Sequence, residues 1–392
     1  MGRIFGSAMI TLVAALPETS HDGFLSRPKA KLITVAFNPS RRPDHNGYFY
    51  LQRSASVDFR YKEYWRNVDA GEWNKRAWTL QENLKSKCLL IFGPMMFHFR
   101  CQQELRAENT QAIRQPDAYG VSWNFHLSSP SAAYVAEPWQ QIIKDYSGRK
   151  LTYALDKLPA ISALAHDIQE RTGVQYLAGL WRDRLVWTLL WECFDYNEGL
   201  APVRSEVYRA PSWSWAAGDG TIAWCPTDQP LEFNEEVVIL DAETTVVGED
   251  PLGRVVGGSL TLTGRIQHAS SLAPGVDDFG GHSLYYKTFV INGAYVRNSY
   301  VSLDWGPPSD VVERMKTEGF WLFLLASYID PEADRWPVPG DSEFSFSGLV
   351  LLAVNNESRD KSVRRFQRVG IFRVIKDGSV FETAPEETII IV

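Results

Sequence analysis

A guanidinium, an indole and a carboxylate lie close together in the segment Arg76-Ala-Trp-Thr-Leu-Gln-Glu82. If a helix begins near Thr79, Trp78 and Glu82 lie one turn apart on the same face of it. The indole would then shield the Glu82 carboxylate from water, and such burial raises the pKa of a carboxyl group. Arg76, just before the helix, is placed to pair with that carboxylate. Glu82 is therefore our candidate catalytic or ligand-binding residue, with Trp78 and Arg76 in support.

A purely structural interpretation fits the same three residues. Arg76 would be a surface cation, Trp78 a core residue, and Glu82 a first-turn residue that the helix dipole favours. Ion pairs that only stabilise a fold also perturb the pKa of carboxyl groups. On residue types alone, we favour this structural interpretation.

Two tryptophans stand two residues apart in the segment Pro211-Ser-Trp-Ser-Trp215. On a strand, Trp213 and Trp215 would face the same side and form an aromatic platform for a sugar or a base. Alternatively, both pack into a core, where most large aromatic side chains lie. We favour the core and keep a carbohydrate-binding platform as the alternative. Arg209, just before this segment, is placed to bridge to Asp219 or to the ends of helices.

Segments typical of well-known catalytic sites are missing from the sequence. It has no Gly-x-Ser-x-Gly elbow, no Walker phosphate-binding loop, no dinucleotide-binding glycine motif and no His-Glu-x-x-His pair. The seven histidines are dispersed, so local spacing assembles neither a metal site nor a Ser-His-Asp set. We therefore expect no bound cofactor and no metal ion.

The composition is that of a folded protein with an aromatic core. Of the 392 residues, 45% are hydrophobic and 22% are charged, which places the chain outside the disordered class. The net charge of -7 argues against a nucleic acid partner, because binding a phosphate backbone normally requires a basic surface.

The N-terminal apolar run Ala8–Leu16 imitates the core of a signal peptide, but Gly6 and Ser7 interrupt it and Pro17 closes it. No run reaches the ~18 apolar residues that a membrane span needs. The four cysteines are far apart in the sequence, which is typical of reduced thiols rather than of a disulfide framework or a zinc site. We expect a cytoplasmic protein without a membrane span.

Hydrophobic patterning predicts an α+β protein with three regions. Residues 1–115 contain an apolar strand-like run, a helical signal around Trp78–Leu84 and a second apolar run at Cys88–Phe92, the order of an α/β unit. Residues 116–204 form a predicted helical region. Residues 205–392 contain short β-prone runs separated by Gly, Pro and Asp, so we expect one antiparallel β-rich domain there, a sandwich or an irregular barrel.

Three predictions for single elements follow from local patterns. Helical spacing predicts two helices, one through Trp139, Ile142, Ile143 and Tyr146 and one through Ile161, Leu164, Ala165 and Ile168. The dipeptide Asp377-Gly378 predicts a two-residue hairpin between Val374 and Val380.

Several segments resemble fungal HET (heterokaryon incompatibility) domain proteins. The segment Arg76–Glu82 resembles the closing motif of the HET domain, with Ala77 where the family usually has Gly, and Met1–Ala15 resembles the family segment that leads from a helix end into a buried strand. Further matches occur in the order typical of large filamentous-fungal HET proteins: Tyr146-Ser147 with Leu151-Thr152, Asp156–Ala160, Tyr176–Trp181, Leu189–Trp191, Tyr208–Trp215, Gly348–Leu351 and Arg368–Phe372.

The resemblance implies a role in fungal non-self recognition, or allorecognition, and in programmed cell death signalling. The implied partners are other proteins of an incompatibility system, and a homo-oligomer is a candidate assembly. No nucleic acid and no membrane span are implied.

HET domains are similar to TIR domains, and TIR domains that cleave NAD carry a Trp followed four residues later by a catalytic Glu. Trp78 and Glu82 have this spacing. The resemblance therefore implies a TIR-like fold for residues 1–115. It also implies an alternative function, an NAD glycohydrolase in which Glu82 binds the nicotinamide ribose hydroxyls and stabilises an oxocarbenium-like transition state. NAD would be the substrate rather than a cofactor.

Two upstream strand motifs of the family, Ser-Tyr-x-Trp-Gly and Trp-Ile-Asp, are absent from this sequence. In the family these strands build the central sheet and the other wall of the nucleotide cleft. We therefore expect an N-terminally truncated HET domain that is inactive in this form.

Overall fold

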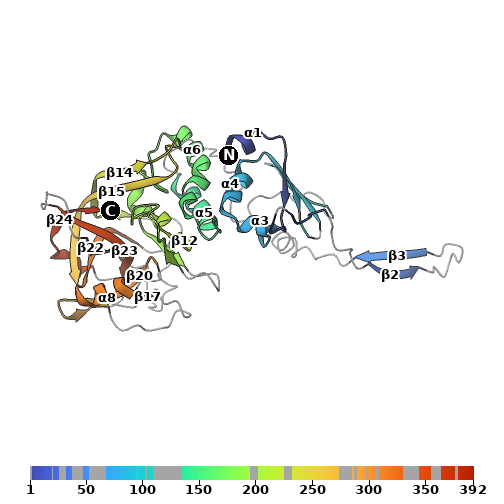
Figure 1. Cartoon of the computed structure of the whole chain (residues 1–392). Helices are drawn as coiled ribbons and strands as arrows, with labels where there is room; N and C mark the ends of the chain where they lie inside the picture. Colours follow the sequence, from blue (N-terminus) through green and yellow to red (C-terminus); the bar gives the residue numbers. More distant parts are fainter. Residues whose placement is uncertain are drawn as a thin grey trace. The chain divides into compact units, whose positions relative to one another are not determined.

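A computed structural model of the chain gives the elements shown in Figure 1. It describes residues 2–19, 21–25, 32–37, 47–52, 68–94, 96–101, 104–108, 135–194, 202–224, 232–272, 285–286, 289–296, 299–305, 309–329, 344–354, 363–375 and 378–392. Contacts between residues divide the chain into an N-terminal unit, Met1–Leu127, and a C-terminal unit, Ser128–Val392. Both units mix helices and strands, so the chain is an α+β protein.

The predicted boundary at about residue 115 falls outside the described residues. The helices expected within 116–204 and the strands expected within 205–392 belong to the same unit. No helix of the described part of the chain is long and apolar enough to cross a membrane.

The N-terminal unit, drawn in blue to cyan in Figure 1, is built around a small sheet. Its helices are α1 (Gly2–Ser7), α3 (Glu72–Lys75) and α4 (Ala77–Lys85). Its strands are β1 (Thr11–Ala14), β2 (Leu32–Phe37), β3 (Gly47–Gln52), β4 (Cys88–Phe92), β5 (Phe97–Cys101) and β6 (Leu105–Ala107).

The sheet of this unit has the strand order β1-β4-β5-β6, and β1 and β4 run parallel. Parallel neighbours need a crossover connection between them. The helices α3 and α4 lie in that connection, immediately before β4. The strand, helix and strand that the sequence predicts in this region are thus confirmed as β1, α4 and β4.

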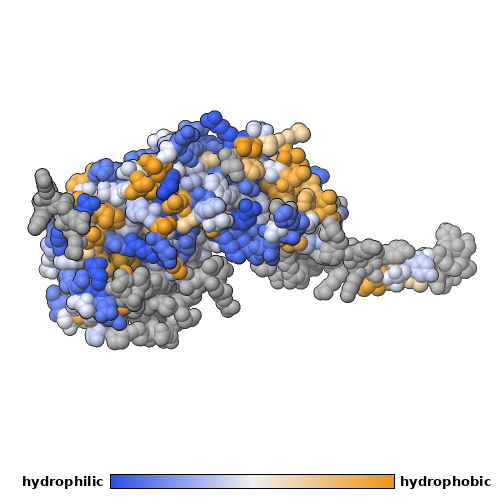
Figure 2. All heavy atoms as spheres, in the orientation of Figure 1, coloured by the Kyte–Doolittle hydropathy of each residue, from blue (hydrophilic) through white to orange (hydrophobic). Residues whose placement is uncertain are grey.

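The two faces of this sheet differ because successive side chains of a strand point to opposite sides. On one face, Val13, Leu89 and Ile91 are buried in a core with Trp73 of α3. On the other face, Leu12 is exposed and Leu90 and Phe92 are only half-buried. In Figure 2 apolar side chains gather over the region where β1 lies in Figure 1.

The strands β2 and β3 form a separate antiparallel ribbon, in which Val35 pairs with Phe49. Both side chains are exposed, as are Ile33 and Tyr48. A two-stranded ribbon of this kind buries little apolar surface, so it adds little to the stability of the unit.

The C-terminal unit begins with helices and short strands. Its helical elements are α5 (Ala136–Ser147), η5 (Ala154–Asp156), η6 (Pro159–Ile161), α6 (Ser162–Thr172), α7 (Leu185–Thr188), η7 (Trp215–Ala217), α8 (Ser309–Thr317) and α9 (Ser379–Glu382). Both helices predicted from spacing are confirmed as α5 and as η6 with α6.

The short strands of this unit are β7 (Tyr176–Leu177), β8 (Leu180–Trp181), β9 (Trp191–Phe194), β10 (Val203–Arg204), β11 (Gly218–Asp219), β12 (Thr221–Trp224), β13 (Asn234–Glu235), β16 (Ser271–Leu272), β17 (Tyr285–Tyr286), β18 (Phe289–Ile291), β19 (Ala294–Tyr295) and β20 (Ser299–Leu303). Its long strands are β14 (Val237–Val246), β15 (Val255–Ala269), β21 (Phe320–Ile329), β22 (Phe344–Ala353) and β23 (Arg364–Ile375), and the shorter β24 (Glu386–Ile391) ends the chain.

Five of these strands close into a ring. Strand β15 pairs with β21, β21 with β22, β22 with β23, β23 with β24, and β24 again with β15. Closure removes the free edges of the strands that form the ring. All of these pairs are antiparallel except β23 with β24. The β-rich domain predicted after residue 205 is therefore an irregular barrel with one parallel pair.

The hairpin predicted at Asp377-Gly378 is wrong. Asp377 lies outside the described residues, and Val380 lies in the short helix α9 rather than in a returning strand. The helical turn buries Phe381 against Phe372 of β23, with ring centroids 5.3 Å apart. Burial of this aromatic side chain outweighs the local turn preference of the dipeptide.

A buried arginine joins the barrel to the segments that precede it. Arg368 of β23 makes a bidentate ion pair with Asp304, with both contacts at 2.8 Å. It also donates to the carbonyl oxygens of Leu189 and Trp191. Its guanidinium carbon lies 3.5 Å from the ring centroid of Trp191. The positive charge of Arg368 is thereby compensated by Asp304, and its N–H groups donate to acceptors inside the protein.

Replacing Asp304 with Asn should destabilise the C-terminal unit strongly, because Arg368 would remain buried with an uncompensated charge. We expect Asp304→Asn to lower the free energy of unfolding by about 3–5 kcal/mol. Urea denaturation followed by tryptophan fluorescence measures this loss.

Glu387→Gln is the matched control for this substitution. It removes the carboxylate that pairs with Arg364, which lies on β23 like Arg368. Both side chains of this pair are about one-third exposed. Water screens such a pair, so the expected loss is below about 1 kcal/mol. Equal losses from the two variants would contradict the role assigned to Arg368.

Candidate functional site

The candidate site in the N-terminal unit is built on the corner between α3 and α4. Gly71 precedes α3 and packs tightly against Ala15, the residue after β1, since a Cβ at position 71 would lie 2.4 Å from the Ala15 carbonyl oxygen. The backbone N–H of Trp73 donates to the same oxygen at 3.1 Å. The Thr79 hydroxyl lies 2.6 Å from the carbonyl oxygens of both Trp73 and Arg76 and fixes the turn between the helices.

Glu82 lies on α4, half-buried, and its carboxylate accepts a hydrogen bond from the indole of Trp73. Burial raises the pKa of the Glu82 carboxyl above its ordinary value. The hydrogen bond from Trp73 and the positive charge of Arg76 favour the ionised form and offset only part of this effect.

The three residues predicted from the sequence lie on or next to α4. This helix begins at Ala77, so Glu82 is not the first-turn residue that the structural interpretation expected. Arg76 is the exposed N-cap residue of α4 and acts on Glu82 through its charge. Trp78 lies one turn before Glu82 on the same helix and is half-buried. The indole that bonds to the carboxylate belongs to Trp73, which sequence reasoning missed. A kink between α3 and α4 brings Trp73 there, and helix spacing alone gives no signal for it.

This arrangement provides a carboxyl group with access to solvent, a raised pKa and an adjacent cation. Such a group can hold a proton longer than an ordinary glutamate, or, once ionised, bind hydroxyl groups and stabilise a developing positive charge. The chemistry available at Glu82 is therefore electrostatic stabilisation or proton transfer.

Trp213 and Trp215 do not form an exposed platform. Both side chains are 0% exposed, and Trp215 lies in the helical turn η7 rather than on a strand. The Trp215 indole donates to the carbonyl oxygen of Gly179 at 2.9 Å, and the carbonyl oxygen of Trp213 accepts from the Trp191 indole at 3.0 Å. Ring faces covered by protein cannot stack on a sugar, so the core interpretation describes these residues.

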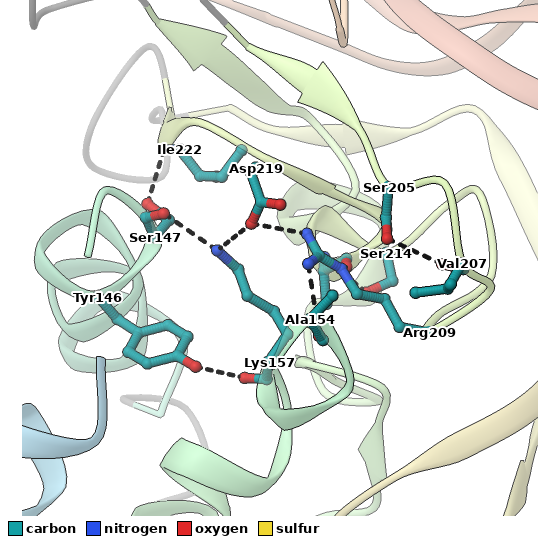
Figure 3. A network of polar contacts seen from close by, with 11 residues as sticks. Tyr146, Ser147, Ala154, Lys157, Ser205, Val207, Arg209, Ser214, Asp219 and Ile222 are labelled. Atoms are coloured by element: carbon teal, nitrogen blue, oxygen red, sulfur yellow. Dashed lines mark hydrogen bonds and ion pairs between the residues drawn. The ribbon is translucent and has the colours of Figure 1, made fainter. Parts of the chain in front are cut away.

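A second cluster of charged residues lies in the C-terminal unit (Figure 3). The ammonium group of Lys157 lies 3.2 Å from Asp219, and the guanidinium of Arg209 lies 2.8 Å from the same carboxylate oxygen. The bridge from Arg209 to Asp219 that the sequence indicates is thus present. Lys157 also donates to the carbonyl oxygen of Ser147 at the end of α5. The cluster joins α5, the segment after it and strand β11.

Lys157 is the most perturbed member of this cluster. Its side chain is only 1% exposed, and burial lowers its pKa from 10.5 to about 8, against the opposing effect of Asp219. Asp219 is more than half exposed, and Lys157 and Arg209 together outweigh its own desolvation, so its pKa is lowered. Because no substrate can reach the Lys157 amine in this conformation, we assign the cluster a structural role.

Lys157 should make the stability of the C-terminal unit rise with pH. Between about pH 8 and 10.5 the folded state binds fewer protons at this amine than the unfolded state does. Raising the pH through this window therefore favours folding. Relative to Lys157→Met, the native chain should gain on the order of 2 kcal/mol between about pH 7.5 and pH 9.5.

Chemical denaturation at a series of pH values measures this gain. Lys144→Met serves as a control, because Lys144 is an exposed lysine on α5. It should leave the pH dependence of the native chain unchanged. A parallel pH profile for the native chain and Lys157→Met would contradict the prediction.

Comparisons with known proteins supply no name for the site. The chain matches no protein-family model, and neither a curated protein nor a solved structure matches it significantly. Within the described ranges, no group of three or more His, Cys, Asp and Glu side chains is placed to hold a metal ion.

Proposed function

We propose that the chain is a HET-type protein of the cytoplasm, of the kind that acts in fungal non-self recognition and programmed cell death signalling. Such a role rests on contacts with other proteins of an incompatibility system rather than on turnover of a substrate, and we expect the chain to be inactive without the two upstream strand motifs. For the N-terminal unit we propose a TIR-like relationship, supported by the parallel pair β1 and β4 with Glu82 on the helix before β4.

One observation carries the proposal. The segments that resemble the HET family are far apart in the sequence, yet in the C-terminal unit they contact one another. Arg368 bonds to the carbonyl oxygens of Leu189 and Trp191, and its backbone N–H donates to the Ser212 hydroxyl at 3.1 Å. Residues selected only by resemblance thus form a connected set of contacts, as expected if the resemblance reflects a shared architecture.

The cellular role is tested by expressing the chain in a filamentous fungus and fusing those hyphae with hyphae that lack it. Because the two upstream strand motifs are absent from this sequence, the chain alone should leave the fraction of dead fusion cells at the level of an empty-vector control, counted with a vital dye. Joined behind those two motifs from a HET-family protein, the chain should raise that fraction several-fold. Equal survival of fusion cells with and without the added motifs would refute the proposal.

A second candidate function is cleavage of NAD at Glu82. It is favoured by one observation, the half-buried carboxylate with a raised pKa beside Trp73 and Arg76. In this function Glu82 would bind the ribose hydroxyls next to nicotinamide and stabilise the positive charge that develops as the glycosidic bond breaks.

Incubation of the purified chain with NAD separates the two candidates. The contact-based role predicts no nicotinamide release above a protein-free blank, measured by liquid chromatography. Release by the native chain that Glu82→Ala abolishes would establish the enzyme instead. Glu72→Ala is the matched control, since Glu72 is an acidic residue of the same corner that pairs with Lys75 rather than with Trp73.

A further inference from the structure

Two cysteines that are 13 positions apart in the sequence lie opposite each other in the N-terminal sheet. Cys88 is the first residue of β4 and Cys101 the last residue of β5, and the antiparallel register pairs them directly. Directly paired residues of antiparallel strands point to the same face of the sheet. Both thiols are free in this structure and half-buried.

The hydrogen-bond pattern shows which kind of pair this is. The backbone N–H of Cys101 donates to Glu104 at 3.0 Å, on the β6 side, and so points away from β4. Phe97, four residues earlier on β5, likewise bonds through its N–H and its carbonyl to Glu108. Cys88 and Cys101 therefore occupy a non-hydrogen-bonded position, where the Cα atoms lie about 4.5 Å apart and the side chains approach most closely.

This spacing permits a disulfide without movement of the strands. Disulfide-bonded cysteines have Cα atoms roughly 4.4–6.8 Å apart, and the pair falls at the short end of that range. Disulfides near the limit of the range, and those exposed to solvent, are the ones most readily reduced again.

The surroundings make the pair accessible to a small oxidant. Cys88 and Cys101 lie on the half-exposed face of the sheet, together with Leu90 and Phe99. Cys193, by contrast, is 0% exposed in the C-terminal unit. Cys225 lies outside the described residues. The two sheet thiols are thus accessible and have a partner directly opposite, whereas Cys193 is sealed inside the protein.

We propose that Cys88 and Cys101 form a reversible disulfide when the protein meets a peroxide, so that this sheet is a redox-sensitive modification site. The disulfide links Cys88, which lies two residues after Ser86, the C-cap of α4, to Cys101 at the end of β5. Oxidation therefore closes the open end of the β4 and β5 hairpin next to the helix that carries Glu82. This proposal does not depend on the function proposed above.

The chemistry balances with hydrogen peroxide as the oxidant. One thiolate attacks a peroxide oxygen, so that an S–O bond forms, the O–O bond breaks and hydroxide leaves, giving a sulfenic acid. The second thiolate then attacks that sulfur, the S–O bond breaks and hydroxide leaves again. Two thiols lose two electrons and two protons, and the peroxide becomes two molecules of water. A dithiol reductant reverses the step.

The test is to treat the reduced full chain with hydrogen peroxide and map its disulfides by mass spectrometry. We expect a mass loss of about 2 Da and a linked pair of peptides containing Cys88 and Cys101, both reversed by dithiothreitol. The oxidised form should also show a thermal midpoint of the N-terminal unit several degrees higher than the reduced form. Each thiol should remain alkylatable before treatment.

Two variants separate the pair from other thiols. Cys88→Ser should abolish the intramolecular link and leave Cys101 as a sulfenic acid that dimedone traps, whereas Cys193→Ser should leave the link intact. Circular dichroism verifies that both variants are folded. A link to Cys225, a link between two chains, or no link at all would overturn the proposal.

Discussion

The assembly of the C-terminal unit depends on the buried guanidinium of Arg368. Burying a cation away from water costs several kcal/mol unless nearly every N–H finds an acceptor. Arg368 meets this requirement only when Asp304, Leu189 and Trp191 are all in place, since each supplies an acceptor. Segments almost 180 residues apart must therefore assemble together. The backbone N–H of Arg368 donates to the Ser212 hydroxyl, which in turn donates to the carbonyl oxygen of Val392, the residue after β24.

The same principle governs the cluster around Lys157. Its ammonium group is buried, and it is compensated by Asp219 and by the end of α5. Arg209 shares that carboxylate and also donates to the carbonyl oxygen of Ala216, next to the buried Trp215. Buried charged side chains therefore fix the positions of irregular segments in this unit. The backbone groups of these segments have few partners in sheets or long helices.

Glu82 in the N-terminal unit presents the opposite arrangement. Its carboxylate is only half-buried, its pKa is raised, and Trp73 and Arg76 compensate it in part. The Glu82 carboxylate is therefore accessible to solvent and can accept further hydrogen bonds. The carboxylate of a fully compensated, buried ion pair can do neither. This difference makes Glu82, rather than Lys157 or Arg368, the residue on which a chemical role can be based. The proposed HET-type role needs no such chemistry.

The sequence by itself determined where several of the helices and strands form, because the period of apolar residues follows from local geometry. It placed α5, α6, β1 and β4, and it identified Glu82 with its neighbour Arg76. The tertiary structure alone decided which residues meet. Trp73 reaches Glu82 through a kink, Cys88 faces Cys101 through strand register, and Arg368 reaches Asp304 because β20 pairs with β23. The predicted hairpin gave way to α9 because Phe381 is buried against Phe372. The period of apolar residues predicts which face of a helix or strand is buried. The partner of each side chain depends on contacts between distant segments, which a local pattern does not predict.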